Sequence, residues 1–305
     1  MTLQNYIILN RKKEFLFLYC ILVISDGSNL IVDKGSKNDM NHGERFINSI
    51  FPELYNLARN DTSLSTGYFD RLVTAQQFSV MFDAINTFAA SGVKVLDWGC
   101  GLGHISYCLD ELGYSTSSYS IQDRPKLIDF MTGKQGKKND FKKGDERDPI
   151  GLPYLDETFE CVLSCGVLEH VREGGGNELS SLGEIKRVLK KEGTFICAHF
   201  PNKYGLTYLL SKLLASKGER ESTYTIGYHK YTYTKTHVLK LCEQSGLELL
   251  YHRRYNFLPR NIFLKFGNSI GNNQAVSLCV NMMDSIMESL FPFFCTSHVF
   301  VAKKK

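Results

Sequence analysis

Residues 93–104 read V-K-V-L-D-W-G-C-G-L-G-H, a short apolar run followed by three glycines at alternate positions. The apolar run predicts a buried strand, which ends at Asp97. The glycines allow a tight turn and let a ligand approach the backbone closely. A helix from Ile105 to Leu112 follows, and Gly113 ends it. Strand, glycine turn and helix together predict a corner that binds a nucleotide-like ligand.

The spacing of the glycines narrows the kind of ligand. A dinucleotide fingerprint reads G-x-G-x-x-G, but here His104 occupies the third glycine position. A phosphate-binding P-loop needs Gly-Lys followed by Ser or Thr, and no lysine follows these glycines. Neither phosphate-binding pattern fits this turn.

The pattern D-x-G-C-G-x-G from Asp97 resembles the first motif of the class I S-adenosylmethionine (AdoMet) methyltransferases. A second stretch, G-D-E-R-D at 144–148 followed by L-P-Y-L-D-E-T-F-E, resembles that family's G-D-A-x-D-L-P-F-x-D-x-S-F-D. The stretch V-L-K-K-E-G-T-F at 188–195 is similar to its V-L-K-P-G-G pattern. The broad type 11 group, which includes ubiquinone-biosynthesis O-methyltransferases, is the most similar.

This resemblance implies AdoMet as the cofactor and assigns roles to particular residues. The glycine loop would wrap the amino acid end of the cofactor, with Asp97 behind the loop. Asp145 would receive the adenine amino group, and the Glu146 N–H would meet a ring nitrogen. Cys165 would line the pocket. The expected cofactor-binding residues are Asp97, Gly99, Cys100, Gly101, Gly103, Ser120, Ile121, Asp145, Glu146 and Cys165.

Ser120 departs from the family pattern. The family carries Asp or Glu at this position, because a carboxylate accepts two ribose hydroxyls side by side. Three readings stay open: Ser120 with Gln122 contacts the ribose more weakly, Asp123 reaches back to it, or Asp123 caps the helix that begins at Pro125.

Methyl transfer requires a nucleophile held in line with the carbon–sulfur bond and, for a hydroxyl, removal of its proton. Imidazole is suited to that step because it titrates near neutral pH. Candidate bases are His199, His229 and His170, the last beside Glu169, and each is equally compatible with a structural role. The histidine and carboxylate spacings predict no metal site.

Strands and helices alternate from 93 to 199, which predicts an α/β fold. The resemblance implies a Rossmann-like, seven-stranded, mostly parallel sheet with helices on both faces, an N-terminal helical extension and a substrate-cap insert. We expect residues 1–40 to be an extension and 41–305 the methyltransferase domain. Within that domain we expect a cofactor-binding core at 91–200, the cap insert at 201–233, and an extra helical link at 254–296.

Composition limits the partners. A net charge of +4 is too small to indicate nucleic acid, and the nine scattered cysteines are typical of a reducing compartment. Lys12 and Lys13 precede the apolar run Phe15–Ile24, which is typical of a dispensable extension, a peripheral membrane anchor or a signal. We therefore expect a cytoplasmic or membrane-associated enzyme, with no nucleic acid partner and an open oligomeric state. Its acceptor would be a small molecule, a sugar or a lipid-linked intermediate, methylated on oxygen. The alternative is a catalytically silent AdoMet-binding module.

Overall fold

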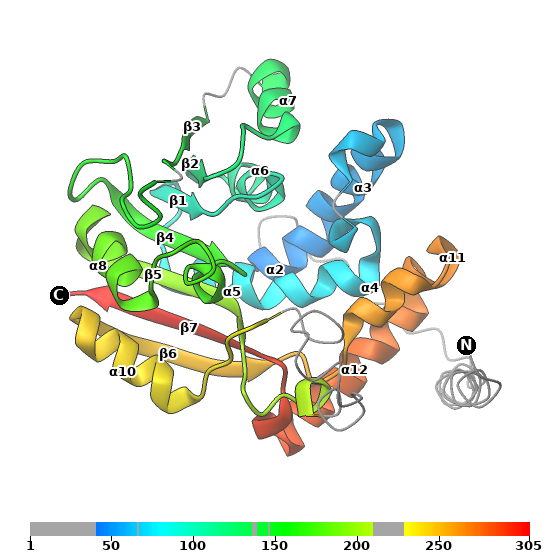
Figure 1. Cartoon of the computed structure of the whole chain (residues 1–305). Helices are drawn as coiled ribbons and strands as arrows, with labels where there is room; N and C mark the ends of the chain where they lie inside the picture. The colour runs from blue at the N-terminus through cyan, green and yellow to red at the C-terminus, as the bar shows by residue number, and fades with distance from the viewer. Residues whose placement is uncertain (1–40, 66, 136–138, 146, 210–228) are drawn as a thin grey trace.

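A seven-stranded sheet with the order β3-β2-β1-β4-β5-β7-β6 forms the centre of the computed structural model (Figure 1). The structure describes residues 41–65, 67–135, 139–145, 147–209 and 229–305. β7 runs antiparallel to β5 and β6, and all other neighbouring strands are parallel. The predicted mostly parallel sheet is confirmed. Its strands are β1 Lys94–Trp98, β2 Ser115–Ser120, β3 Asp140–Lys143, β4 Phe159–Cys165, β5 Leu189–Pro201, β6 Leu247–Tyr255 and β7 Ser297–Lys304.

Helices cover both faces of the sheet because alternate strand residues face two separate cores. In β1, Val95 faces the core shared with α5, α6 and α7, while Leu96 faces the core shared with α8 and α10. Both residues are fully buried, as expected for a sheet covered on both sides. The helices around the sheet are α3 Phe51–Asn60, α5 Ser79–Phe88, α6 His104–Glu111, α7 Lys126–Gln135, α8 Glu178–Val188 and α10 Lys235–Ser245.

The N-terminal helical extension is present but is more broken than its apolar spacing suggests. In place of long helices, residues 42–64 and 68–88 form a series of short helical pieces. Phe46 and Phe82 pack together in the first core, with ring centroids 4.6 Å apart. The pieces are α2 His42–Arg45, the π-helical η1 Phe46–Ile50, the 3₁₀ turns η2 Thr62–Leu64 and η3 Tyr68–Asp70, α4 Leu72–Ala75 and η4 Gln76–Phe78.

The last strands are longer than their sequence patterns indicate. β6 pairs with β7 from Leu247↔Lys304 to Tyr255↔Ser297, so the antiparallel ladder carries β6 four residues past its apolar run. The segment between these strands contains η6 Arg260–Lys265, α11 Asn268–Gly271, α12 Gln274–Leu290 and η7 Pro292–Phe294. None of the described helices is long and apolar enough to cross a bilayer.

The domain boundaries inferred from the sequence stay predictions. Residues 1–40 lie outside the described residues, as do residues 210–228 of the expected cap insert.

Candidate functional site

The carboxyl ends of the parallel strands β1, β2, β4 and β5 meet at one edge of the sheet. In α/β sheets such an edge, where the strand order reverses, is the usual ligand site. The chain runs from β1 to β2 and β3 on one side of β1 and then returns to β4 on its other side. The strand order therefore reverses at β1. The predicted site residues Asp97, Ser120, Cys165 and His199 all stand at or near these ends.

The glycine loop after β1 adopts a backbone that requires its glycines. Gly99, Gly101 and Gly103 have φ values of +81°, +50° and +86°, a region that L-residues seldom adopt. The N–H groups of Gly99 and Cys100 both donate to the Tyr119 carbonyl at 2.9 Å, which ties the loop to β2. A Cβ on Gly99 would lie 2.4 Å from Val167 Cγ2, whereas a Cβ on Gly101 would meet nothing within 4 Å. The loop therefore has an open face above Gly101, where a ligand can lie.

Asp97 is buried behind this loop. Its Oδ2 accepts a hydrogen bond from Ser106 Oγ of α6 at 2.6 Å, and Ser106 Oγ lies 2.7 Å from Ser118 Oγ of β2. Burial raises the pKa of Asp97 to about 6, partly offset by the bonds from Ser106. The carboxyl group thus joins loop, helix and neighbouring strand from behind, which is the position that the resemblance implies.

The ribose end of the expected pocket is built differently from the family pattern. Ser120 is buried, and its Oγ accepts a hydrogen bond from the Gln122 N–H at 3.0 Å. The Asp123 carboxylate pairs with Lys143 at 2.7 Å. It is therefore bound to the end of β3 and not to Ser120. Ile121 is half exposed beside them.

The Asp145 carboxylate is already bound to the Arg147 side chain. Its Oδ1 accepts hydrogen bonds from the Arg147 N–H at 2.9 Å and from Arg147 Nε at 3.1 Å, and Arg147 Nη2 lies 3.1 Å from Oδ2. These bonds hold the pKa of Asp145 below its usual value. Arg147 is a residue that the sequence reasoning missed, although the spacing Asp-x-Arg was visible. Glu146 lies outside the described residues.

A buried carboxyl group without hydrogen bonds lies beyond the end of β4. Gly166, at φ +68°, turns the chain into η5 Leu168–His170, which buries the Glu169 side chain. Both carboxyl oxygens of Glu169 lack a hydrogen-bond partner among the described residues. The nearest cationic candidate is His229, whose Nδ1 lies 3.6 Å from Glu169 Oε1.

Burial keeps this pair neutral. It raises the pKa of Glu169 to about 8. Burial and then the neighbouring His170 lower the pKa of His229 to about 4. At neutral pH Glu169 is therefore a carboxylic acid and His229 a neutral imidazole, so the short contact between them is not an ion pair.

The other two candidate histidines lie at the same edge. His199 ends the regular part of β5 at φ +57°, and its ring packs against Phe78 at 4.6 Å and Tyr255 at 5.5 Å. Its Nε2 is buried without a partner among the described residues, and burial lowers its pKa to about 3. The His170 ring lies 5.4 Å from that of His229, and its Nδ1 lies 3.2 Å from Glu173 Oε1.

The residues present fit the amino acid end of AdoMet and, beside it, a polar acceptor. The open face above Gly101 suits the amino acid end, and unpartnered polar atoms of Ser164, Glu169, His199 and His229 suit a polar acceptor. Cys165 is partly buried between them, and burial raises its thiol pKa well above the usual value. For the ribose and adenine ends of AdoMet, the described residues offer fewer free hydrogen-bond acceptors than the family pattern supplies.

A metal ion would find three ligands in Glu169, His170 and His229. One donor atom from each lies within 4.8 Å of the others. The sequence predicted no metal site, and that stays a prediction. It overlooked this grouping because residues 169 and 229 come together only in the fold.

Comparison with known proteins gives the family of the central segment. Residues 96–197 match the family model described as a methyltransferase domain. An uncharacterized protein of Methanocaldococcus jannaschii, MJ0638, is 33% identical over 104 residues, which are 33% of this chain and 38% of that protein. The match thus spans well under half the length of that relative.

Solved structures with similar folds include a SAM-dependent methyltransferase from Methanosarcina mazei. It is 19% identical, with a TM-score of 0.48, over 72% of this chain and 96% of that one. Another is 1,6-didemethyltoxoflavin-N1-methyltransferase from Burkholderia thailandensis, solved with its substrate and S-adenosylhomocysteine. It is 16% identical, with a TM-score of 0.46, over 90% of this chain and 93% of that one.

Proposed function

We propose that this chain, which carries a class I, AdoMet-dependent methyltransferase domain, transfers the AdoMet methyl group to a hydroxyl group. The acceptor would be a small molecule, a sugar or a lipid-linked intermediate. The observation that carries the proposal is the placement of two features at one sheet edge. A glycine loop with an open face lies on one side, and buried polar atoms without partners lie on the other.

The geometry assigns a task to each group. Bound AdoMet supplies a methyl group made electrophilic by its sulfonium. The backbone of Gly99 to Gly103 would hold the amino acid end of the cofactor, and Asp97 fixes the loop through Ser106. The acceptor oxygen would attack in line, forming the C–O bond as the C–S bond breaks, and much of the rate would come from this positioning.

The proton of the acceptor hydroxyl would pass to a neutral imidazole. The His229 imidazole is neutral at neutral pH, and its Nδ1 has no hydrogen bond among the described residues, so in the tautomer that leaves Nδ1 without a proton it would accept the acceptor's proton directly. His199 Nε2 offers a second acceptor at the same edge. Glu169, protonated beside His229, can donate a hydrogen bond to the acceptor oxygen and orient it.

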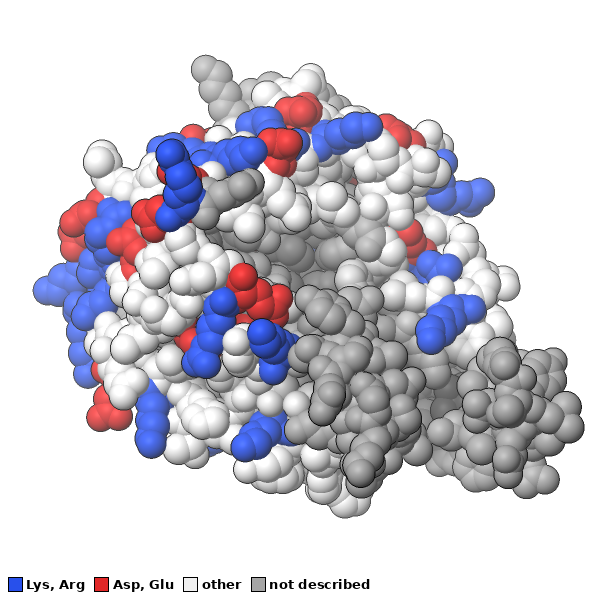
Figure 2. Space-filling model, in the orientation of Figure 1, with Lys and Arg blue, Asp and Glu red and all other residues white. Residues whose placement is uncertain are grey.

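A nucleic acid acceptor fits this surface less well than a small one. On the face visible in Figure 2, Lys and Arg side chains are interspersed with Asp and Glu. A phosphate-tracking surface would instead gather cations in one stripe.

The test is a labelled-methyl experiment. The full chain is incubated with AdoMet labelled in its methyl group and with cell extract separated into lipid, sugar, small-molecule and polymer fractions. The proposal expects label in one of the first three fractions, with much less for His229→Ala. Label confined to the polymer fraction would contradict the proposed acceptor class.

The alternative is a silent AdoMet-binding module. Ser120 at the ribose position and the engagement of Asp145 by Arg147 motivate it. Calorimetric binding of AdoMet without label in any fraction would favour this module over the enzyme.

A further inference from the structure

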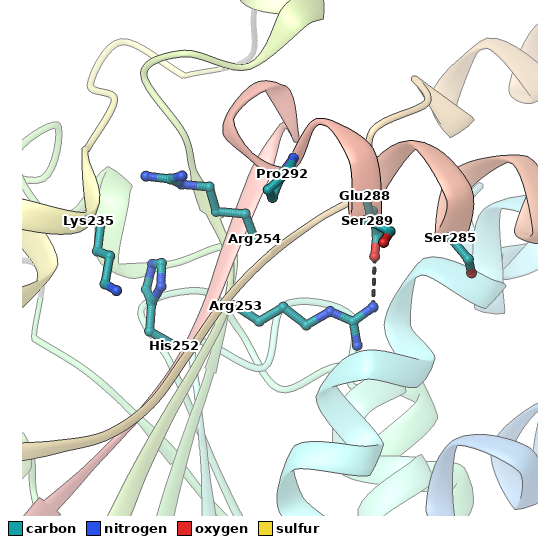
Figure 3. A pocket seen from close by; sticks show the side chains of 8 residues that line it. All are labelled: Lys235, His252, Arg253, Arg254, Ser285, Glu288, Ser289 and Pro292. Carbon is teal, nitrogen blue, oxygen red and sulfur yellow. Dashed lines mark hydrogen bonds and ion pairs between the residues drawn. The ribbon is translucent and has the colours of Figure 1, made fainter.

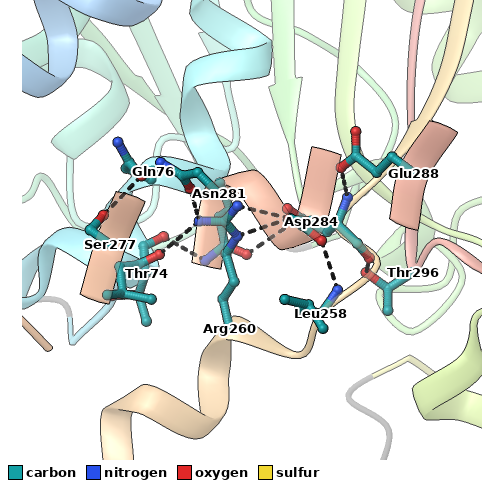
Figure 4. Close-up of polar contacts among 12 residues, drawn as sticks. Thr74, Gln76, Leu258, Arg260, Ser277, Asn281, Asp284, Glu288 and Thr296 are labelled. Carbon is teal, nitrogen blue, oxygen red and sulfur yellow. Dashed lines mark hydrogen bonds and ion pairs between the residues drawn. The ribbon is translucent and has the colours of Figure 1, made fainter. Parts of the chain in front are cut away.

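Helix α12 turns several polar residues toward the protein and a row of apolar residues toward solvent. Figure 4 shows the inward side, where Asp284 is buried against Arg260 of η6. Asp284 Oδ2 accepts hydrogen bonds from Arg260 Nη2 at 2.8 Å and Nε at 3.2 Å, and its Oδ1 accepts one from the Leu258 N–H at 2.8 Å. The centre of α12 is therefore held against the rest of the protein by an ion pair and hydrogen bonds.

The same arrangement continues toward both ends of α12. Ser277 Oγ donates to Gln76 Oε1 at 2.9 Å near the start of the helix. Near its end, Glu288 accepts hydrogen bonds from Arg253 Nη2 and the Asn256 N–H, both at 2.7 Å. Polar contacts thus hold the inward side of α12 near its start, centre and end, while Val280 packs between them against Val73 and Phe263.

The outward side is an apolar stripe. Leu278, Met282, Ile286 and Leu290, spaced by four residues, have 54%, 57%, 55% and 64% of their surfaces exposed. Phe291, Phe293 and Phe294 continue the stripe and are also exposed. Of the fifteen large apolar side chains exposed in the described residues, nine lie between 262 and 294. Such a concentration marks an interaction surface, since scattered exposed apolar residues would be ordinary.

A cationic pocket of about 380 Å³ lies beside the C-terminal end of α12 and the start of η7 (Figure 3). Lys235 and Arg254 line it, together with Pro292 of η7. The Arg254 guanidinium lies 5.3 Å from the Phe293 ring centroid, and its buried Nε has no hydrogen-bond partner among the described residues. The one carboxylate that lines the pocket is Glu288, which already binds Arg253. The positively charged side chains of Lys235 and Arg254 can therefore bind an anion in this pocket.

We propose that α12, η7 and this pocket form a docking surface for an anionic lipid membrane. The apolar stripe would lie in the acyl boundary, as the face of an interfacial amphipathic helix does. Lys235 and Arg254 would bind lipid phosphates beside the three phenylalanines. A second copy of the chain suits the surface less well, because a two-fold contact places the same patch on both sides. Among the described residues, the one carboxylate that lines this pocket, Glu288, is already bound to Arg253 and does not meet the other cations.

Vesicle binding tests this surface independently of the methyl transfer proposed above. The full chain is sedimented with vesicles of phosphatidylcholine alone and of phosphatidylcholine with phosphatidylglycerol. We expect binding to the anionic vesicles that falls as salt is added. The double variant Met282→Gln/Ile286→Gln should weaken vesicle binding about tenfold or more, since two apolar side chains that would enter the membrane are lost. Lys235→Gln/Arg254→Gln should remove the preference for the anionic lipid.

The matched control is Leu155→Gln/Leu239→Gln, which alters two exposed leucines outside the stripe and should leave vesicle binding unchanged. Binding that survives the α12 double variant would overturn the proposal. A dimer in analytical ultracentrifugation that the same variant dissociates would also overturn it, because a second copy would then cover the stripe. AdoMet titration of each variant separates these outcomes from any failure of the proposed methyl transfer.

Discussion

The fold strongly alters the chemistry of Glu169. Its carboxyl group is buried, has no hydrogen bond within the described part of the chain, and has its pKa raised to about 8. Such a group is favoured in the native state only when protonated. The site therefore holds a neutral acid beside neutral imidazoles, which suits the binding of an uncharged hydroxyl.

This environment predicts a pH-dependent stability. An unfolded glutamate releases its proton near pH 4.5 and the folded one near pH 8, so between these values the native state binds one more proton than the unfolded state. The contribution of Glu169 is thus fully present below about pH 4.5 and is lost as pH rises to about 8. Glu169→Gln, which mimics the protonated form, should have a higher free energy of unfolding than wild type at pH 8, by about 2–4 kcal/mol. At pH 5 the two should be nearly equal. Urea unfolding at both pH values measures this, and parallel pH curves would disprove it.

Ser120 gives a prediction about cofactor affinity. Ser120→Asp should restore the paired acceptor that the ribose lacks and tighten AdoMet binding by about 1–2 kcal/mol, close to tenfold. Calorimetry measures the change, with Ser115→Asp at the exposed, opposite end of β2 as the control. An unaltered affinity would mean that another group already contacts the ribose.

At the scale of single residues, the sequence predicts local geometry better than contacts. The glycines at 99, 101 and 103 were predictable because a tight turn before a helix demands positive φ. The approach of Glu169 to His229 was not, because it joins segments 60 residues apart in the chain. Asp123 was ambiguous for the same reason, since its partner Lys143 comes from the next strand.

Among the elements, α12 is where the sequence is most misleading. The sequence analysis expects a helical link at 254–296, and the structure places α12 within it at Gln274–Leu290. Ordinary amphipathic reasoning would bury Leu278, Met282 and Ile286. The structure exposes them, because the neighbouring η6 and β6 present Arg260 and Arg253, which attract Asp284 and Glu288.

The docking of α12 can be tested through its buried ion pair. Asp284→Ala should lower the free energy of unfolding by about 3 kcal/mol or more, because it leaves the Arg260 charge buried and unpaired. The double variant Asp284→Leu/Arg260→Met should recover much of that loss. Thermal or urea unfolding measures both, with Asp129→Ala of the exposed Arg124–Asp129 pair as a control expected to change stability by less than about 1 kcal/mol. A double variant no more stable than Asp284→Ala would refute this coupling.

For the whole molecule, the alternation of strands and helices predicted an α/β fold. The family resemblance supplied the seven-stranded, mostly parallel sheet with helices on both faces. The strand order, with β7 antiparallel between β5 and β6, comes from the structure, since apolar runs alone do not give strand order. All of these elements place the glycine loop at the edge where the strand ends meet.

The central claim is that AdoMet lies on the open face of this loop. It is tested by calorimetric titration of AdoMet into the wild-type full chain, Gly101→Ala and Gly92→Ala. Both glycines have positive φ and open space where a Cβ would stand, so the two substitutions impose similar backbone strain. We predict saturable binding by wild type and by Gly92→Ala, and an affinity about tenfold or more weaker for Gly101→Ala, whose methyl group would occupy the ligand's place. No binding by wild type, or equal binding by all three proteins, would contradict the account.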